Sequence, residues 1–407
     1  MPDLHALYRD LHAHPELSWQ EFRTAGVLAD ALRPLGYEVT TEIAGTGVVG
    51  VLRNGEGPTV MLRADIDALP VLEATGLPYA STVRATTSDG ADVPVAHACG
   101  HDMHATCLIG AAERLATTRD EWSGTLLVVF QPAEELGQGA RAMVDAGLFD
   151  RFGTPEVVLA QHVSPLPAGM IAHGSGPVMA ASDSVRVTLH GRGGHGSAPE
   201  TAIDPVLMAA HCVVRLQGIV SREIAPSERA VVTVGRLQAG TKENVIPDTA
   251  EIGVNIRSFN EHVRGIVKAA VERIVRAEAA ASGAPREPEF DWYDGTPVLV
   301  SDPDATTRTM AAFAEHFGKN NLIPGAVVNA SEDVGVFGAA AGVPTVFWFL
   351  GGTDFSKREP GQPVAMNHAP EYAPDLEPTL TTGMDALVVA ARTWLGQAVS
   401  RKFVGRQ

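Results

Sequence analysis

The sequence is poor in cysteine and in positive charge. It has 3 cysteines, an odd and small number that argues against a disulfide framework and leaves room for a thiol with a chemical role. Its 31 Lys and Arg residues stand against 48 Asp and Glu, which gives a net charge of -17. Because a field of that sign repels phosphate backbones and anionic lipid surfaces, neither nucleic acid nor a membrane is an expected partner.

Long apolar runs are also missing. No segment is apolar for long enough to span a bilayer, and the N-terminal "MPDLHALYRDLHAHPELSWQEF" lacks the basic segment and apolar run of a secretory signal. We therefore expect a cytoplasmic protein. The 45% of hydrophobic residues is enough for a sizeable core, and a length of 407 residues favours two domains.

Strand-like and helix-like segments alternate over most of the chain. Short apolar runs predict buried strands, and helical spacing of apolar residues predicts helices between them. This alternation is typical of an α/β sheet that is at least partly parallel. The predicted strands are 59–62, 125–130, 156–160 and 344–350, and the predicted helices are 4–35, 104–116, 139–149, 303–317 and 377–396.

The middle of the chain has a different order. Strands are predicted at 183–191, 229–240, 249–259 and 289–293, with helices at 203–220 and 261–281. This β-α-β-β-α-β order is a complete ferredoxin-like unit. We therefore interpret residues 179–294 as a domain inserted into an α/β domain formed by residues 1–178 and 295–407.

Side chains that bind metals gather where the predicted α/β strands end, which is where ligands of such sheets collect. The stretch "AHACGHDMH" (96–104) adds one thiol and three imidazoles. Thiolate, imidazole and carboxylate together are typical of a transition-metal site, and their number allows two metals. The residues at the strand ends are Asp65, Asp67, Glu134, Glu135, His162 and His368.

Two other hypotheses remain open from these residues alone. Cys99 could act as a nucleophile, with His97, His101 or His104 as its base. Alternatively, the protein could bind a metal or a peptide without catalysis. The pair Glu134–Glu135 favours an enzyme, because a pure binding site has no need of an unliganded base beside the metal.

Six motifs carry a family resemblance. They are "ADIDALPV", "HACGHDMHAT", "QPAEE", "GRGGHGSAPE", "KENVIPDTAEIGVNIRSF" and "MNHAPEY". In this order they resemble the di-metal amidohydrolase and metallopeptidase family of aminoacylases and carboxypeptidases, and specifically its hippurate hydrolase and indole-acetyl-amino-acid hydrolase branch. The match extends from about Leu11 to the last helix. It implies an exopeptidase-like catalytic domain, with the inserted domain serving as a lid and for dimerisation.

The resemblance also implies roles for particular residues. Glu134 would be the general base and then the acid in cleavage of the amide bond of N-acyl amino acids. Other branches have an H-x-D motif where this chain has Asp65 and Asp67, so Asp67, like Asp102, is expected to orient a ligand instead of binding metal. Two divalent ions, Zn, Mn, Co or Ni, would be bound by Cys99, His101, Glu135, His162 and His368.

The resemblance assigns three residues of the inserted domain to the substrate. His195 would donate to the tetrahedral oxyanion, often from the partner subunit of a dimer. Asn244 and Arg257 would contact the substrate, and Arg257 suits a free carboxylate because guanidinium binds it with two parallel hydrogen bonds. Arg192 could bind the carboxylate in the same way. A homodimer or higher homo-oligomer is therefore expected. A metallo-carboxypeptidase or dipeptidase using the same site is the alternative function.

Overall fold

The computed structural model describes residues 3–357, 361 and 363–397, and the chain forms two compact units. The first comprises Met1–Gly176, Val300–Val327 and Asp333–Gln407, and the second comprises Pro177–Leu299 and Val328–Glu332. Within the second unit, the Ala180 N–H donates to the carbonyl of Ala330 at 2.9 Å. Residues 328–332 thus return to the second unit, which local sequence patterns did not predict.

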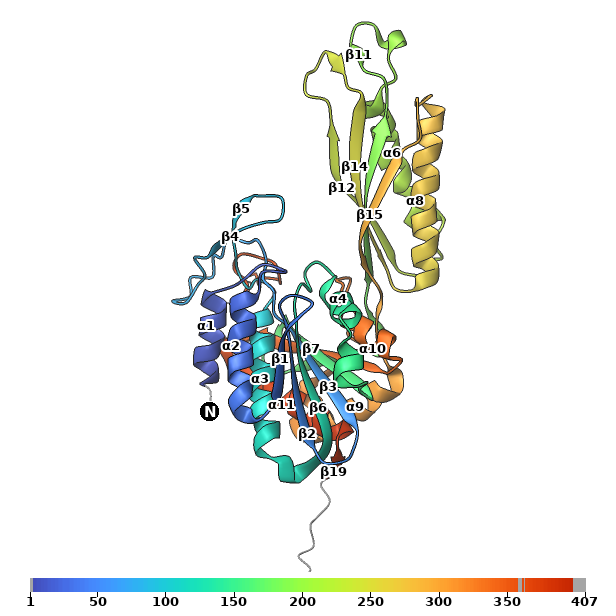
Figure 1. Ribbon diagram of the computed structural model, residues 1–407. Coiled ribbons are helices and arrows are strands. Elements are labelled where there is room, and N and C mark those ends of the chain that lie inside the picture. Colours follow the sequence, from blue (N-terminus) through green and yellow to red (C-terminus); the bar gives the residue numbers. More distant parts are fainter. Residues whose placement is uncertain (1–2, 358–360, 362, 398–407) are drawn as a thin grey trace, which may run out of the picture. The chain divides into compact units, whose positions relative to one another are not determined.

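A mixed sheet forms the centre of the first unit (Figure 1), in the order β1-β2-β6-β3-β7-β18-β8-β17, with β19 beside β6. β3 pairs in parallel with β6 and β7, and β7 pairs in parallel with β18, so the carboxyl ends of these four strands share one edge. The strands are β1 Glu38–Ile43, β2 Gly47–Asn54, β3 Thr59–Asp65, β6 Trp122–Gln131, β7 Val157–Pro167, β8 Ile171–His173, β17 Leu322–Pro324, β18 Thr345–Thr353 and β19 Gly396–Gln397.

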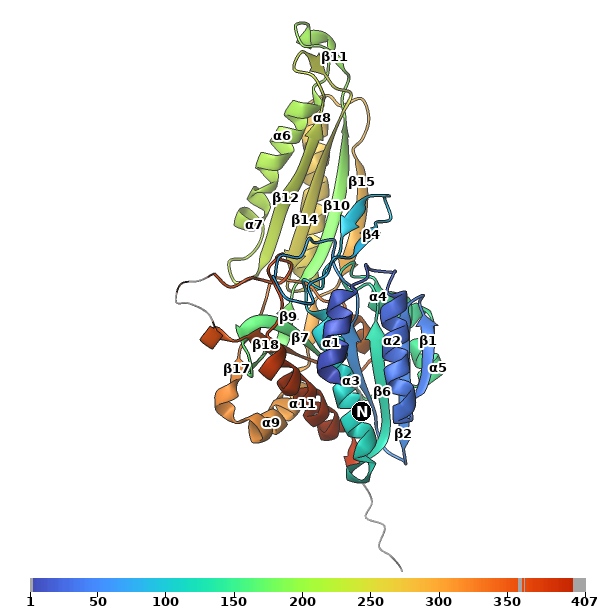
Figure 2. The same cartoon turned by 90° about the vertical axis from the view of Figure 1, so that its left-hand side faces the viewer.

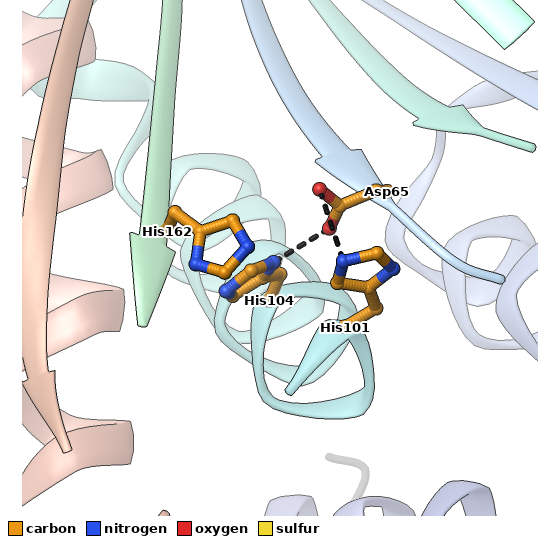
Figure 3. Close-up of side chains that lie close together, drawn as sticks. All are labelled: Asp65, His101, His104 and His162. Atoms are coloured by element: carbon orange, nitrogen blue, oxygen red, sulfur yellow. Dashed lines mark hydrogen bonds and ion pairs between the residues drawn. The ribbon is translucent and has the colours of Figure 1, made fainter. Parts of the chain in front are cut away.

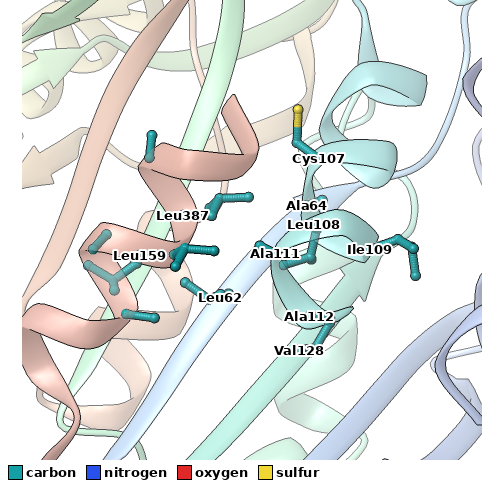
Figure 4. Packing of buried hydrophobic residues seen from close by; sticks show 14 of the residues in the cluster. Leu62, Ala64, Cys107, Leu108, Ile109, Ala111, Ala112, Val128, Leu159 and Leu387 are labelled. Atoms are coloured by element: carbon teal, nitrogen blue, oxygen red, sulfur yellow. The ribbon is translucent and has the colours of Figure 1, made fainter. Parts of the chain in front are cut away.

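Helices cover both faces of this sheet (Figures 1 and 2). One face packs against α2 Phe22–Leu32, α3 His101–Thr117, α9 Pro303–Phe317 and α11 Leu376–Trp394, with α1 Leu4–Ala13 packed against α3. The other contacts α4 Gly139–Asp145 and α10 Gly335–Ala341, with α5 Leu148–Phe152 beside them. Because successive side chains of a strand point to opposite faces, two covered faces require uninterrupted apolar strands. Figure 4 shows Leu62, Val128 and Leu159 packed with Leu108 and Leu387.

The second unit has a four-stranded antiparallel sheet in the order β12-β14-β10-β15. Its elements follow the β-α-β-β-α-β order of a ferredoxin-like unit. Val187, Cys212, Ile252 and Val271 lie in its core. The elements are β10 Ala181–His190, α6 Pro205–Leu216, α7 Gly218–Arg222, β12 Ala230–Ala239, β14 Thr249–Ser258, α8 Glu261–Ala281 and β15 Glu289–Thr296.

The remaining strands are short. They are β4 Arg84–Thr86, which pairs with β5 Asp92–Pro94, and β11 Gly194–His195, which pairs with β13 Val245–Ile246; β9 Gly176–Met179 and β16 Leu299–Ser301 lie where the chain passes between the units. Among the described residues, no helix has both the length and the apolar character needed to cross a membrane.

Several predicted segments differ from the structure. The helices predicted at 139–149 and 203–220 are each two helices, α4 and α5 in the first case and α6 and α7 in the second. The helix predicted at 4–35 is two helices, because Pro15 lies between α1 and α2 and proline lacks the N–H that a continuous helix needs. The strand predicted at 156–160 continues to Pro167, so His162 lies inside β7 and not after it. β2 was not predicted as a strand.

Candidate metal centre

The turn before α3 brings a thiol and two imidazoles together. Gly100 adopts a φ of +89°, and a Cβ there would lie 2.4 Å from Cγ1 of Val163, so this position requires glycine for conformation and for space. His101 and His104 lie one helical turn apart, and their rings stack with centroids 5.4 Å apart. Cys99 precedes this turn and is buried.

The structure brings the five predicted metal ligands together. One atom from each of Cys99, His101 and Glu135 lies within 4.8 Å of the others. Sγ of Cys99 is 3.4 Å from Nε2 of His162, and Oε2 of Glu135 is 3.4 Å from Nε2 of His368. The ligand atoms come from the α3 turn, the turn after β6, the middle of β7 and the loop before α11.

The hydrogen bonds of these residues leave lone pairs available for a cation. Nδ1 of His162 donates to the Val163 carbonyl at 2.7 Å, so in the neutral ring Nε2 faces Cys99 without a proton. Within the described residues, Nε2 of His101 and Oε1 of Glu135 are buried without a hydrogen-bond partner. Because such atoms are costly to bury, the residues fit a transition metal that accepts sulfur, nitrogen and oxygen ligands.

Negative charge surrounds His101. Its ring nitrogens lie 3.3 Å from Asp67, 3.7 Å from Asp65 and 3.8 Å from both Glu134 and Glu135. Burial lowers the pKa of His101, but Asp65 first, and then Asp67 and Glu135, outweigh it and raise that pKa to about 10. Without a metal, a proton therefore occupies the ring that a cation would bind.

The same surroundings determine whether the Cys99 thiol is protonated. Burial and then Glu135 and Glu134 raise the pKa of its thiol well above the usual value. A nucleophilic cysteine needs the opposite, a lowered pKa beside positive charge. The surroundings of Cys99 therefore disfavour the cysteine-nucleophile hypothesis and favour a thiolate that forms only when a cation is bound.

Asp65 and His104 interact with each other and lie next to the predicted ligands His101 and His162 (Figure 3). Nδ1 of His104 donates to Oδ1 of Asp65 at 2.5 Å, and Nε2 of His104 accepts the Val163 N–H at 2.7 Å. Asp65 also accepts from the buried Arg63 at 2.8 Å. Although Asp65, His101, His104 and His162 place ligand-type atoms within 4.8 Å of one another, both nitrogens of His104 are already engaged.

Asp67 contacts two of the predicted ligands. Its Oδ1 lies 3.3 Å from Nδ1 of His101, and its Oδ2 accepts the Glu135 N–H at 3.0 Å. Ser18 donates its hydroxyl to the same Oδ2 at 2.7 Å. Asp67 can therefore orient His101 and Glu135, the role expected of it.

Asp102 has a different partner from the one expected. It accepts from Nδ1 of His12 at 2.7 Å and from the Met103 N–H at 2.9 Å. Its contacts thus tie α3 to α1 and do not orient a predicted ligand. His12 also bonds Glu73 at 3.0 Å, and although burial lowers the pKa of His12, Asp102 and Glu73 raise it to about 10. His12 is not among the residues predicted from the sequence.

The loop that carries His368 is attached to the α3 turn. The His368 N–H donates to the Ala98 carbonyl at 2.7 Å, and the Asn367 side chain donates to the carbonyls of Cys99 at 3.0 Å and Val163 at 3.2 Å. The backbone of His368 has a positive φ of 72°. These contacts bring His368 from late in the chain to Cys99, the predicted thiol ligand.

Two of the predicted substrate residues of the second unit lie together. β11 pairs with β13, and the Gly196 N–H donates to the Asn244 carbonyl at 2.9 Å, which places His195 and Asn244 at one end of the unit. Nδ1 of His195 accepts the Ser197 N–H at 3.1 Å. In the neutral ring, Nε2 therefore carries the proton and is a donor on an exposed side chain.

Arg257 lies at the opposite end of the same sheet. It pairs with Ser182 at the start of β10, whereas Thr249, at the end near His195, pairs with His190. Arg257 donates to Asn255 and to Ser331, both at 2.9 Å. At about 3.4 Å per residue, Thr249 and Arg257 are separated by roughly 27 Å along β14.

This arrangement of fold and ligands places the chain among the metal-dependent amide hydrolases. Residues 61–391 match Peptidase family M20/M25/M40, and the chain belongs to this family. It is 36% identical over 372 residues to thermostable carboxypeptidase 2 of Saccharolobus solfataricus, with 90% of this chain and 89% of the relative covered. It is 39% identical over 330 residues to hippurate hydrolase of Campylobacter jejuni, covering 80% and 82%.

A solved structure supports the same assignment. The YXEP protein of Bacillus subtilis, described as a dinuclear metal binding peptidase from the M20 family, superposes with a TM-score of 0.74 and 31% identity. The comparison covers 95% of this chain and 97% of that one. The predicted family and the α/β fold class are thus confirmed.

Proposed function

We propose that this protein hydrolyses the amide bond of N-acyl amino acids with two divalent ions. The observation that carries the proposal is the convergence of ligand-type sulfur, nitrogen and oxygen atoms beside Glu134, of which Nε2 of His101 and Oε1 of Glu135 are buried without a hydrogen-bond partner among the described residues. Bound ions of the Zn, Mn, Co or Ni type would supply Lewis acidity, polarising a carbonyl and making water more acidic. Cys99, His101, Glu135, His162 and His368 would hold them.

Glu134 would move the proton in this reaction. Its carboxylate is largely buried and lies 3.8 Å from Nε2 of His101. It would accept a proton from the attacking water and deliver it to the leaving amine nitrogen as the C–N bond breaks. One carboxylate beside the ligands can do both, because the water and the leaving nitrogen occupy the same small volume.

The substrate class can be tested with a panel of amides. Among N-acetyl and N-benzoyl amino acids and unblocked dipeptides, we expect the N-acyl amino acids to give the highest kcat/KM, measured as release of free amino acid. The relative named hippurate hydrolase supports N-acyl amino acids as substrates, and the relative named carboxypeptidase supports dipeptides. Dipeptides that are cleaved faster than every N-acyl amino acid would favour the dipeptidase alternative.

Two chains would complete one site. A small N-acyl amino acid cannot touch His195 and Arg257 of the same sheet, since roughly 27 Å separates the two ends of β14. We therefore assign His195 and Asn244 to the site of a second copy. Exposed apolar side chains on the edge strand β12, Val231 and Leu237, and on the adjacent α6, Leu207 and Val214, support a homodimer formed through this unit.

Mixed dimers distinguish a shared site from an internal one. His195→Ala and Glu134→Gln should each be nearly inactive alone. Co-refolded in equal amounts, they should recover about one quarter of wild-type activity, because half of the random dimers then hold one intact site. Recovery is measured as specific activity against each variant refolded alone. No recovery, although exchange of subunits is verified with tagged chains, would place His195 in its own chain's site.

A further inference from the structure

The residues on both sides of Glu134 are linked to the N-terminal segment between α1 and α2, Ala133 directly and Glu135 through Asp67. The Ala133 N–H donates to Oε1 of Glu21 at 2.9 Å. The Glu135 N–H donates to Asp67, which also accepts from Ser18. Glu21 and Asp67 are both fully buried, with 0% of their surface exposed. Glu134 thus lies between two anchored backbone amides.

The turn that carries Glu134 needs such anchoring. Ala133 has a φ of +49°, a conformation that costs free energy for a residue with a Cβ. Its carbonyl accepts from the N–H groups of Gln138 at 3.3 Å and Gly139 at 3.1 Å, which closes the turn. The Trp19 indole donates to the side chain of Gln138 at 3.4 Å. The N-terminal segment therefore contacts this turn on more than one side.

Glu21 is free for this role because another residue caps the next helix. Glu21 precedes α2 but makes no capping hydrogen bond with its side chain. Instead, the Glu16 carboxylate accepts the N–H groups of Arg23 at 3.0 Å and Thr24 at 2.7 Å. Thr46 donates to the other oxygen of Glu21 at 2.6 Å, which fixes the carboxyl against Ala133.

We propose that Ser18–Glu21 is a positioning clamp that holds the general base in its reactive orientation. The clamp touches no substrate and acts through the backbone N–H groups of Ala133 and Glu135, the residues on either side of Glu134. This inference rests on the proposed function, in which Glu134 transfers the proton. Reacting groups displaced by about 1 Å can lose about 100-fold in rate, so a clamp of this kind affects kcat before it affects binding.

The test compares Glu21→Ala with a matched control on the same segment, Glu16→Ala, which removes a carboxylate that caps α2 and does not touch the turn. Metal content, Tm, kcat and KM are measured for both. We expect Glu21→Ala to lower kcat by about 10-fold to 100-fold, with KM and metal content unchanged. Glu16→Ala should lower Tm and leave kcat within about threefold of wild type.

Glu21→Gln provides the rescue. Burial and then Asp67 raise the pKa of Glu21 to about 7, and an amide oxygen can accept the Ala133 N–H as a carboxyl does in either form. This variant should therefore keep near-wild-type kcat, and Ser18→Ala should give a smaller loss than Glu21→Ala. Wild-type kcat in Glu21→Ala, or equal losses in Glu21→Ala and Glu16→Ala, would overturn the clamp. An active Glu134→Gln enzyme would instead overturn the proposed function.

Discussion

Glu134→Gln should lower kcat by about 1,000-fold or more while leaving the metals bound. The amide fills the same space as the carboxylate but can neither take a proton from water nor return one to the leaving nitrogen. The five predicted ligands remain intact, so the metal content should match that of wild type. The measurement combines steady-state kinetics with elemental analysis of the purified protein.

Glu156→Gln is a suitable control, because Glu156 is exposed and none of the predicted ligands neighbours it in sequence. It should retain wild-type kcat and metal content. If Glu134→Gln were fully active, Glu134 would not be the base. If its loss of activity were matched by a loss of metal, Glu134 would be a ligand, and the assignment of roles within the Glu134–Glu135 pair would have to be exchanged.

Removing the metal should abolish activity, and adding back one divalent metal at a time should restore it. The pKa values of Cys99 and His101 are both raised in the metal-free protein, so both are protonated at neutral pH and metal binding must displace these protons. Affinity should therefore rise with pH between about 6 and 8, and binding should release protons. Chelator titrations at several pH values, with proton release followed in weak buffer, measure both effects.

The control for chelation is Cys107→Ala, because Cys107 is a buried free thiol in the core with its pKa raised by burial, and it is not a predicted ligand. It should need the same metals as wild type, whereas Cys99→Ala should bind them more weakly. Full activity after complete chelation, with covalent labelling of Cys99 by substrate, would support the nucleophile hypothesis instead.

Much of the metal centre could be predicted because the chemistry lies where strands end. The apolar runs before Asp65, Glu134 and His162 indicate buried strands, and the carboxyl ends of parallel neighbours share one edge. The assignment of individual residues as metal ligands depended on the family resemblance that the ordered motifs carry. That the other predicted ligands lie next to His368 depends on the path of a loop, which no local sequence pattern predicts.

The partners of buried polar side chains could not be predicted. Asp102 lies in the first turn of α3, next to His101, and was expected to orient a ligand; its partner is His12, from a helix far away in sequence. Glu21 was predicted to lie within a helix over 4–35, and as a charged residue it gave no sign of burial, yet it is fully buried. Burial of such residues is decided by tertiary packing, which local periodicity does not report.

The position of His162 inside β7 links the ligands to the sheet itself. The backbone of one residue, Val163, accepts from His162 and Asn367 through its carbonyl and donates to His104 through its N–H. Val163 is also in register with Leu350 of β18. A shift of one residue between these strands would turn every side chain of β7 to the other face. Because the predicted ligand His162 lies in β7, we expect metal to bind during refolding only after β7 and β18 have paired in the correct register.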